Sequence, residues 1–356
     1  MNWLLASCAA VLLSSCAVDP APVQHGLPAV YLVVDSDDVA RMRQGTYTKT
    51  GVAGDVFLNG RWFTGRITFS GESTIDDLKK GFNLVLNDAG RAKYRLNAMS
   101  ADPSALRAVL AFAAHGAVDL GTIEPKHVTV FLNRDYSGLY LLHEVIDPEL
   151  LEERGDRAIA IYAAKGRLAD LESTANLEVA FDTRVGTENY ADLDELVERT
   201  LTTEKDFTKG LDAILDIDSA LRYMAAATFT QNGDGITNNY VLTRSRREER
   251  FRFWPWDVDR TFSTTGPRCS DDLLAGNALM RRLRADPVSA DAYRNHLLEL
   301  DSEAHRRALV ELLNERAAEI GQAHRLDPYL GGAGSSLDQE VRQLTALLSA
   351  PLCDED

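Results

Sequence analysis

Three polar side chains in the second half of the sequence could together handle a metal-bound phosphate. Asp234 and Asn239 lie five residues apart in a polar segment, and Asp257 follows an aromatic stretch further along. Phosphoryl transfer to a hydroxyl requires an acceptor for the hydroxyl proton and oxygen ligands for the Mg²⁺ that neutralises the phosphates. A carboxylate such as Asp234 suits the first task, and Asn239 and Asp257 suit the second.

A predicted β-hairpin explains how residues so far apart in sequence could meet. Residues 240–243 and 251–255 are apolar or aromatic runs on either side of a polar turn. A hairpin returns the chain to where it left, so Asn239 at its entry and Asp257 at its exit are expected to be neighbours. Asp259 is a reserve metal ligand, because two acids two positions apart on an extended strand end can share one face.

The segment around Asp234 also has an ordinary structural interpretation. Asn-Gly-Asp-Gly is a strong turn signal, because Asn, Asp and Gly tolerate positive φ and cap turns locally. On that interpretation Asp234 and Asn239 are turn residues only. The segment Trp-Pro-Trp-Asp-Val-Asp favours the chemical interpretation, because turn chemistry does not explain a strand that ends in two aromatics and two acids.

Six short motifs, taken in order, resemble those of the spore coat protein H (CotH) kinases, a family of divergent protein kinase-like proteins. The resemblance runs from about Arg66 to the helices after Phe262. The motifs are Arg66-x4-Gly71-x-Ser73, Lys79-Lys-Gly-Phe-Asn-Leu84, Asp102-Pro-Ser-x-Leu-Arg107, Ser137-Gly-Leu-Tyr-Leu-Leu-His-Glu-Val-Ile-Asp147, residues 234–240, and Trp254-Pro-Trp-Asp-Val-Asp-Arg-Thr-Phe262. Any one of them is weak, whereas six in sequence are specific.

The resemblance implies an α+β, divergent protein kinase-like fold with two lobes. Residues 28–147 are expected to form a β-rich N-terminal lobe, and residues 148–350 a mostly helical C-terminal lobe that carries the catalytic hairpin. The implied activity is that of an atypical protein kinase that uses ATP and Mg²⁺ to phosphorylate Ser or Thr hydroxyls of a protein. Asp234 would then be the catalytic base, and Asn239, Asp257 and Asp259 the metal ligands.

The family's lysine that grips the ATP phosphates corresponds to the pair Lys79 and Lys80. Alternation along a strand points only one of them toward the site. Lys80, which shares its face with Phe82 and Leu84, is favoured, and Lys79 is kept as the alternative. Glu144 matches the acid of the family's Leu-Tyr-x-Leu-x-Glu signature and could pair with the lysine or border the nucleotide. Solvated surface positions are the alternative for all three charged residues.

The chain departs from kinases at points that bear on nucleotide binding. In kinases a helix supplies the carboxylate partner of the phosphate-binding lysine. The corresponding helix, expected at about residues 103–118, has no acid after its first residues. Either Glu144 or Glu72 supplies that charge, or the ion pair is absent. Gly71 lies in a single-glycine turn, and Ser263 stands where relatives often carry Gly. A non-catalytic kinase-like surface lipoprotein that binds a protein partner or a glycan is therefore an alternative, as is a phosphotransferase with a non-protein acceptor.

The N-terminal residues predict export. Residues 3–13 are an apolar run too short to span a membrane comfortably, and a Pro-rich stretch follows. Leu13-Ser-Ser-Cys16 looks like a bacterial lipobox, so residues 1–16 are interpreted as a signal peptide with Cys16 as the lipidation site, and residues 17–27 as a linker. The chain is expected to be an exported lipoprotein of the bacterial cell envelope, held to the membrane by lipid on Cys16. A cleaved signal with an incidental cysteine is the alternative.

Composition limits the partners further. A formal net charge of −16 argues against nucleic acid, because nothing offsets the repulsion. Cys269 and Cys353 could form a disulfide after export or stay unpaired. Cys353 lies within an acidic tail at residues 351–356. The seven histidines show no zinc-ligand spacing, and His115 lies in an apolar helix where a packed role is expected.

Hydrophobic periodicity places the remaining elements. A second hairpin is expected at residues 128–132 and 139–145, and a strand at 158–162. A helix at residues 217–229 delivers the chain to Asp234. Further helices are predicted at 273–283, 290–300, 302–323 and 337–348.

Overall fold

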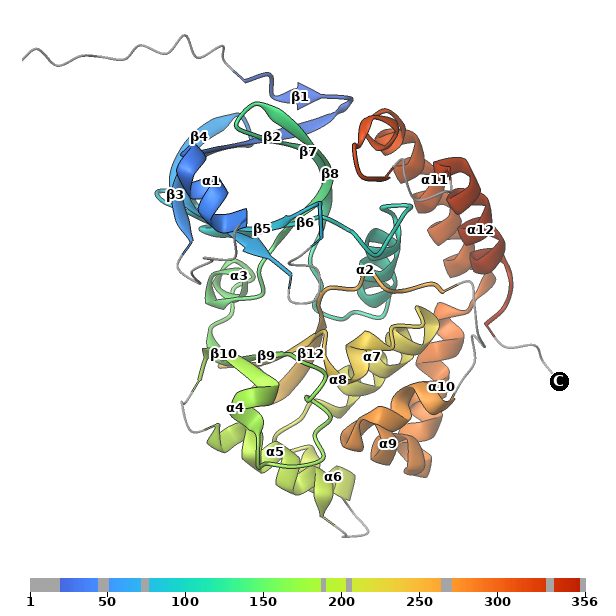
Figure 1. The fold of residues 1–356 in the computed structure, drawn as a ribbon. Coiled ribbons are helices and arrows are strands. Elements are labelled where there is room, and N and C mark those ends of the chain that lie inside the picture. Colours follow the sequence, from blue (N-terminus) through green and yellow to red (C-terminus); the bar gives the residue numbers. More distant parts are fainter. Residues whose placement is uncertain are drawn as a thin grey trace, which may run out of the picture.

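The computed structural model describes residues 20–43, 51–71, 77–186, 190–202, 207–263, 271–330 and 336–352. Cys16, Glu72, Ser73, Cys269 and Cys353 lie outside the described residues. A β-rich part comes first in the chain and a mostly helical part follows, as Figure 1 shows. The α+β class predicted from the sequence is confirmed.

The first part is a sheet that closes on itself. Its strands are β1 (Val23–Gln24), β2 (Leu27–Val34), β3 (Val52–Leu58), β4 (Arg61–Ser70), β5 (Gly81–Leu86), β6 (Lys93–Asn97), β7 (Lys126–Leu132) and β8 (Asp135–Glu144). They follow the order β1-β2-β3-β4-β5-β6-β8-β7, and a parallel pairing of β2 with β7 closes the ring seen in Figure 1. β1 lies inside residues 17–27, the stretch predicted to be a linker, and its two residues pair with β2.

Alternation of apolar residues along these strands builds the interior of the barrel. Leu32, Ile67, Leu96 and Val130 are essentially inaccessible to solvent, and they belong to one cluster inside the ring. Successive side chains of a strand point to opposite faces, so one apolar face per strand suffices to fill a closed sheet. Helix α1 (Ser36–Arg43) adds Met42 to this cluster.

The second part contains a smaller sheet and most of the helices. The sheet has the order β10-β9-β11-β12, with β9 (Ala158–Ala164), β10 (Phe181–Val185), β11 (Tyr240–Ser245) and β12 (Phe251–Pro255). The helices are α3 (Pro148–Glu153), α4 (Leu177–Ala180), α5 (Ala191–Leu201), α6 (Phe207–Leu211), α7 (Ile217–Phe229), α8 (Asp234–Thr237), η1 (Asp271–Gly276), α9 (Ala278–Ala285), α10 (Pro287–Leu300), α11 (Glu303–Leu326) and α12 (Leu337–Ser349). The two predicted hairpins, the strand near residue 158 and the helix at 217–229 are therefore confirmed.

Helix α2 (Arg107–Ala117) joins the two parts. By sequence it lies between β6 and β7, yet its buried residues Leu110, Ala111 and Ala114 belong to the core shared with the helical part. It packs against α7 and α11. No helix within the described ranges is both long enough and apolar enough to cross a membrane.

Candidate active site

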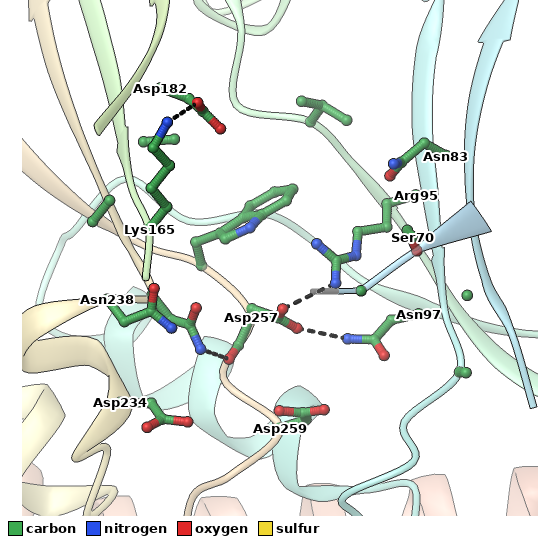
Figure 2. Close-up of a pocket in the computed structure, with 18 of the residues that line it drawn as sticks. Ser70, Asn83, Arg95, Asn97, Lys165, Asp182, Asp234, Asn238, Asp257 and Asp259 are labelled. Atoms are coloured by element: carbon green, nitrogen blue, oxygen red, sulfur yellow. Dashed lines mark hydrogen bonds and ion pairs between the residues drawn. The ribbon is translucent and has the colours of Figure 1, made fainter. Parts of the chain in front are cut away.

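A cleft of about 680 Å³ lies between the barrel and the smaller sheet. Its lining comes from β5 and β6 on one side and from β9, α8 and the residues after β12 on the other. Asp234, Asn239, Asp257 and Asp259 all line it, and Figure 2 labels Asp234, Asp257 and Asp259, with neighbouring Asn238, along one region of the wall. The structure thus brings together the catalytic and metal-binding residues predicted from the sequence.

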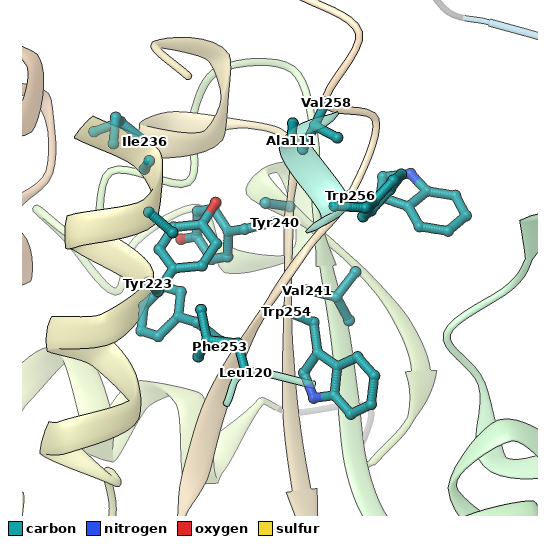
Figure 3. Packing of buried hydrophobic residues seen from close by; sticks show 14 of the residues in the cluster. Ala111, Leu120, Tyr223, Ile236, Tyr240, Val241, Phe253, Trp254, Trp256 and Val258 are labelled. Carbon is teal, nitrogen blue, oxygen red and sulfur yellow. The ribbon is translucent and has the colours of Figure 1, made fainter. Parts of the chain in front are cut away.

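Aromatic packing holds the segment that carries these residues. The ring of Phe253 on β12 lies 5.1 Å, centroid to centroid, from both Tyr223 on α7 and Tyr240 on β11. Figure 3 shows these rings packed between helix and hairpin. The Tyr223 hydroxyl also donates to the carbonyl of Gly235 at 2.7 Å. The buried rings therefore anchor the turn that presents Asp234.

Backbone contacts place Asn239 beside Asp257. The amides of Asn238 and Asn239 donate to the carbonyl of Asp234 at 3.1 and 3.0 Å, which closes the short helix α8. The side-chain amide of Asn239 donates to the carbonyl of Asp257 at 3.2 Å, and Trp256 N donates to the carbonyl of Asn239 at 3.3 Å. The expectation that the entry and exit of the hairpin are neighbours is confirmed.

Asp257 is held by two residues of β6. Its Oδ1 accepts from Asn97 Nδ2, and its Oδ2 from an Arg95 guanidinium nitrogen, both at 2.9 Å. Its backbone has φ +53°, a left-handed conformation that non-glycine residues rarely adopt and that tends to occur at functional sites. The Asp257 carboxylate therefore points away from its own hairpin and toward β6 on the other side of the cleft.

Asp259 places a second carboxyl group in the cleft with Asp257. Burial, and after it the charges of Asp257 and Asp102, raise the pKa of Asp259 to about 8. Within the described part of the chain, no group of three or more His, Cys, Asp or Glu side chains is arranged to hold a metal. Two acids and the amide of Asn239 still form the kind of oxygen set that Mg²⁺ accepts when water completes its shell. A divalent cation fits here, because it would offset the carboxylate charge that burial makes unfavourable.

Basic side chains cover much of the remaining lining. Among the described residues, those lining the cleft are Lys93, Arg95, Lys165, Arg167, Arg184 and Arg260. They gather in one place on a chain whose formal net charge is −16. A cluster of this kind focuses positive potential where a polyanion such as a triphosphate would bind.

Two of these arginines flank Asp234. Arg167 contacts its Oδ1 at 3.2 Å, and Arg260 its Oδ2 at 3.6 Å. Both guanidinium side chains are well exposed, whereas Asp234 is mostly covered. Exposed ion pairs of this kind are weak and exchange readily, so the Asp234 carboxylate can still accept a proton from a ligand.

Trp256 supports the guanidinium groups of Arg95 and Arg184. Their central carbons lie 5.5 and 5.0 Å from the indole centroid. Arg184 also donates to the carbonyl of Ile146 at 2.6 Å, and burial lowers its pKa to about 10. The indole thus keeps two cations at the cleft wall.

Lys79, Lys80 and Glu144 are not among the described residues that line the cleft. Lys79 Nζ donates to Asp327 Oδ2 at 2.8 Å and to the carbonyl of Leu139 at 2.5 Å, and the ion pair is buried. Burial lowers the pKa of Lys79, while the Asp327 charge raises it. Lys80 Nζ lies 6.0 Å from the Phe69 ring centroid.

Glu144 pairs with Arg91 at 3.4 Å and not with either lysine. Contact of these three residues with phosphate or nucleotide therefore has no support from the geometry. The physical reason is clearest for Lys79, whose ammonium already has a carboxylate partner in a dry environment.

Arg95 and Asn97 were not recognised from the sequence. They lie two positions apart on β6 and therefore share a face, with Arg95 opposite Asn83 of β5. The alternation of polar and apolar residues in Tyr94-Arg-Leu-Asn97 was the available signal.

Comparison with known proteins identifies the family. The chain matches the family described as "CotH kinase protein" over residues 67–349. It belongs to the CotH kinase family. The resemblance stated from the six motifs is confirmed, and the α+β fold is that of a kinase-like protein of this family.

Individual proteins that resemble the chain share less than a third of its sequence over the matched residues. The chain is 29% identical over 258 residues to the inner spore coat protein H of Bacillus subtilis (strain 168), a match that covers 67% of this chain and 70% of that protein. The Helicobacter pylori proinflammatory kinase CtkA gives a TM-score of 0.34 at 9% identity, covering 85% of this CotH kinase family member and 93% of CtkA.

A second solved structure is the Shewanella oneidensis toxin–antitoxin complex of HipA, HipB and operator DNA. Its matched chain gives a TM-score of 0.39 at 11% identity, with 90% of this chain and 71% of that chain covered. Both TM-scores are too low to support an argument about the site.

Proposed function

We propose that this CotH kinase family member is an ATP and Mg²⁺ dependent phosphotransferase that phosphorylates Ser or Thr hydroxyls of a protein in or outside the cell envelope. The observation that supports this most directly is the cleft itself. Asp234, Asn239, Asp257 and Asp259 share it with a cluster of basic side chains. Family membership supports the same class of reaction.

The acids divide between two roles in the proposal. Asp234 would orient the acceptor hydroxyl and take its proton, since a positioned carboxylate can serve as a general base. Asp257 and Asp259, with Asn239, would hold Mg²⁺, which would neutralise phosphate charge when bound. The surrounding arginines would bind the phosphate oxygens, for which the guanidinium fork is well shaped.

Replacing Asp234 tests the catalytic assignment. Asp234→Asn should lower radiolabel transfer from ATP to protein acceptors by about 10²- to 10⁴-fold, because it removes the proton acceptor and keeps the shape. Nucleotide binding measured by calorimetry should persist. Asp182→Asn is the matched control, since Asp182 also lines the cleft but is exposed and pairs with Lys165. Transfer that survives in Asp234→Asn would remove this residue from catalysis.

The competing function is a non-catalytic kinase-like lipoprotein that binds a partner or a glycan. The burial of Lys79 against Asp327 favours it, because the lysine expected at the phosphates is engaged elsewhere. Wild-type protein that shows no calorimetric signal with ATP and Mg²⁺ would support this alternative. Transfer to sugar but not to protein acceptors would instead indicate a non-protein substrate.

We also propose that the chain is exported and anchored through lipid on Cys16. The support is the lipobox-like Leu13-Ser-Ser-Cys16 after an apolar run. Intact-mass analysis of the membrane fraction should show a lipidated chain that begins at Cys16, and Cys16→Ser should release the protein from the membrane. A wild-type chain that begins at another residue and carries no lipid would refute the anchor.

A further inference from the structure

The strand β6 occupies an informative place in the barrel. β4 and β5 pair as antiparallel neighbours, and Ser70 and Gly81 at their adjoining ends line the cleft. β6 is the next strand both along the chain and in the sheet, and α2 follows it. In protein kinases a turn between two such strands covers the phosphates, and the next strand carries the cation that grips them.

Arg95 is the basic side chain that β6 directs at Asp257. The ion pair is 2.9 Å long, and the two side chains are only 15% and 24% exposed. Limited solvent makes such a charge-assisted contact stronger than one on the open surface. Asn97 on the same strand holds the other carboxylate oxygen.

The other basic side chains near the cleft have different partners. Lys93 pairs with Asp147 at 3.4 Å and is about half exposed. Arg167 and Arg260 contact Asp234, and Arg184 donates to the Ile146 carbonyl. Within the described residues, Arg95 is therefore the cation that contacts the proposed metal ligand Asp257.

This pairing has opposite consequences for the two ligands of the proposed function. A divalent cation at Asp257 would meet the positive guanidinium of Arg95. A phosphate at Arg95 would meet the negative carboxylate of Asp257. When both bind, the guanidinium can turn to phosphate and the carboxylate to metal, so each repulsion is replaced by an attraction.

We propose that Arg95, not Lys79 or Lys80, is the phosphate-binding cation of this cleft, and that its pairing with Asp257 makes metal and nucleotide bind interdependently. The inference rests on the proposed function, because it assumes that the cleft binds nucleotide and a divalent cation. Trp256 supports the reorientation, since its indole lies under the Arg95 guanidinium and does not compete with phosphate for the N–H donors.

The test uses Arg95→Gln in the full chain, with Mn²⁺ as the metal probe. Removing the guanidinium should tighten binding of Mn²⁺ alone by roughly threefold or more, because the repulsion at Asp257 is gone. It should weaken binding of a non-hydrolysable ATP analogue in the presence of Mn²⁺ by roughly tenfold or more, because a charge-assisted phosphate contact is lost. Electron paramagnetic resonance measures free Mn²⁺, and calorimetry measures the analogue.

Two variants control for loss of structure and of charge. Lys93→Gln removes the same charge from the same strand but does not touch Asp257, so it should not tighten Mn²⁺ binding. Arg95→Lys keeps the charge and should recover part of the nucleotide affinity. Circular dichroism checks the folding of every variant, and a general structural defect would weaken both ligands rather than move them in opposite directions.

The possible results separate the two levels of the proposal. Wild-type protein that binds Mn²⁺ and nucleotide, with Arg95→Gln unchanged in nucleotide affinity or weaker for Mn²⁺ alone, overturns the role of Arg95 and leaves the proposed function standing. Wild-type protein that binds neither ligand overturns both. Changes of opposite sign in Arg95→Gln, absent in Lys93→Gln, support the inference.

Discussion

Replacing Lys79 with methionine separates a structural role from a role in phosphate binding. Methionine keeps an unbranched apolar stem of similar length but removes the ammonium that pairs with Asp327. The structure predicts that Lys79→Met destabilises the fold and leaves nucleotide affinity of the folded protein unchanged. A phosphate ligand would give the opposite result.

The expected destabilisation follows from the surroundings of Asp327. The Lys79 and Asp327 side chains are 4% and 0% exposed, and Nζ lies 2.8 Å from Oδ2. The Asp327 carboxylate also accepts from the backbone amides of Leu139, Tyr329 and Leu330 at 2.7, 2.8 and 3.0 Å. Removing one partner of a buried ion pair typically costs about 3–5 kcal/mol of unfolding free energy. Because three backbone donors remain, we expect about 3 kcal/mol, at the lower end of that range.

Urea unfolding followed by tryptophan fluorescence measures the change. Lys80→Met is the matched control: the adjacent lysine is partly exposed and should change the unfolding free energy by less than about 1 kcal/mol. The double variant Lys79→Met/Asp327→Leu should recover part of the loss, since it no longer leaves an uncompensated buried charge. Calorimetry with nucleotide and Mg²⁺ is run on each folded variant.

One result would refute this reasoning. If Lys79→Met unfolds at the wild-type urea concentration but binds nucleotide more than about tenfold more weakly, Lys79 is a phosphate ligand. The ion pair with Asp327 would then be a contact that nucleotide displaces. Arg95 would lose its assigned role at the same time.

Two further predictions concern the metal site and the buried histidines. Asp257→Ala should weaken Mg²⁺-dependent nucleotide binding by more than about tenfold with an unchanged circular dichroism spectrum, and unchanged binding would exclude Asp257 from the site. Burial lowers the pKa of both His115 and His127 from 6.5 to about 4. Between these two pH values both histidines take up protons when the chain unfolds. Their contribution to stability is therefore complete above pH 6.5 and is lost as the pH falls toward 4. Between about pH 7.5 and pH 5.5, each should reduce the unfolding free energy by about 1.4 kcal/mol. His115→Leu should flatten this dependence in urea titrations, and an equally steep slope would contradict the assignment.

Local chain geometry was sufficient to predict much of the site. Asn239 and Asp257 were expected to meet because a hairpin joins them, and the register of β11 with β12 brings its two ends together. The helix α7 could be predicted because its apolar residues recur at helical spacing, although the structure buries it on nearly all sides and not along a single stripe. In both cases neighbouring residues along the chain contain the signal.

The identity of the phosphate-binding cation depends on contacts that no local pattern contains. Lys79 forms a buried ion pair with Asp327, which lies 248 residues later in the chain. Arg95 pairs with Asp257, which lies 162 residues later. Strand alternation limits which side chains share a face, but packing of the barrel against the helices decides which face meets a carboxylate and which meets the cleft. The sequence by itself therefore determined the family, the hairpin and the polar residues Asn239 and Asp257 at its ends. Only the tertiary structure decided which basic residue lies opposite them, because burial and charge pairing depend on segments that fold together from distant parts of the chain.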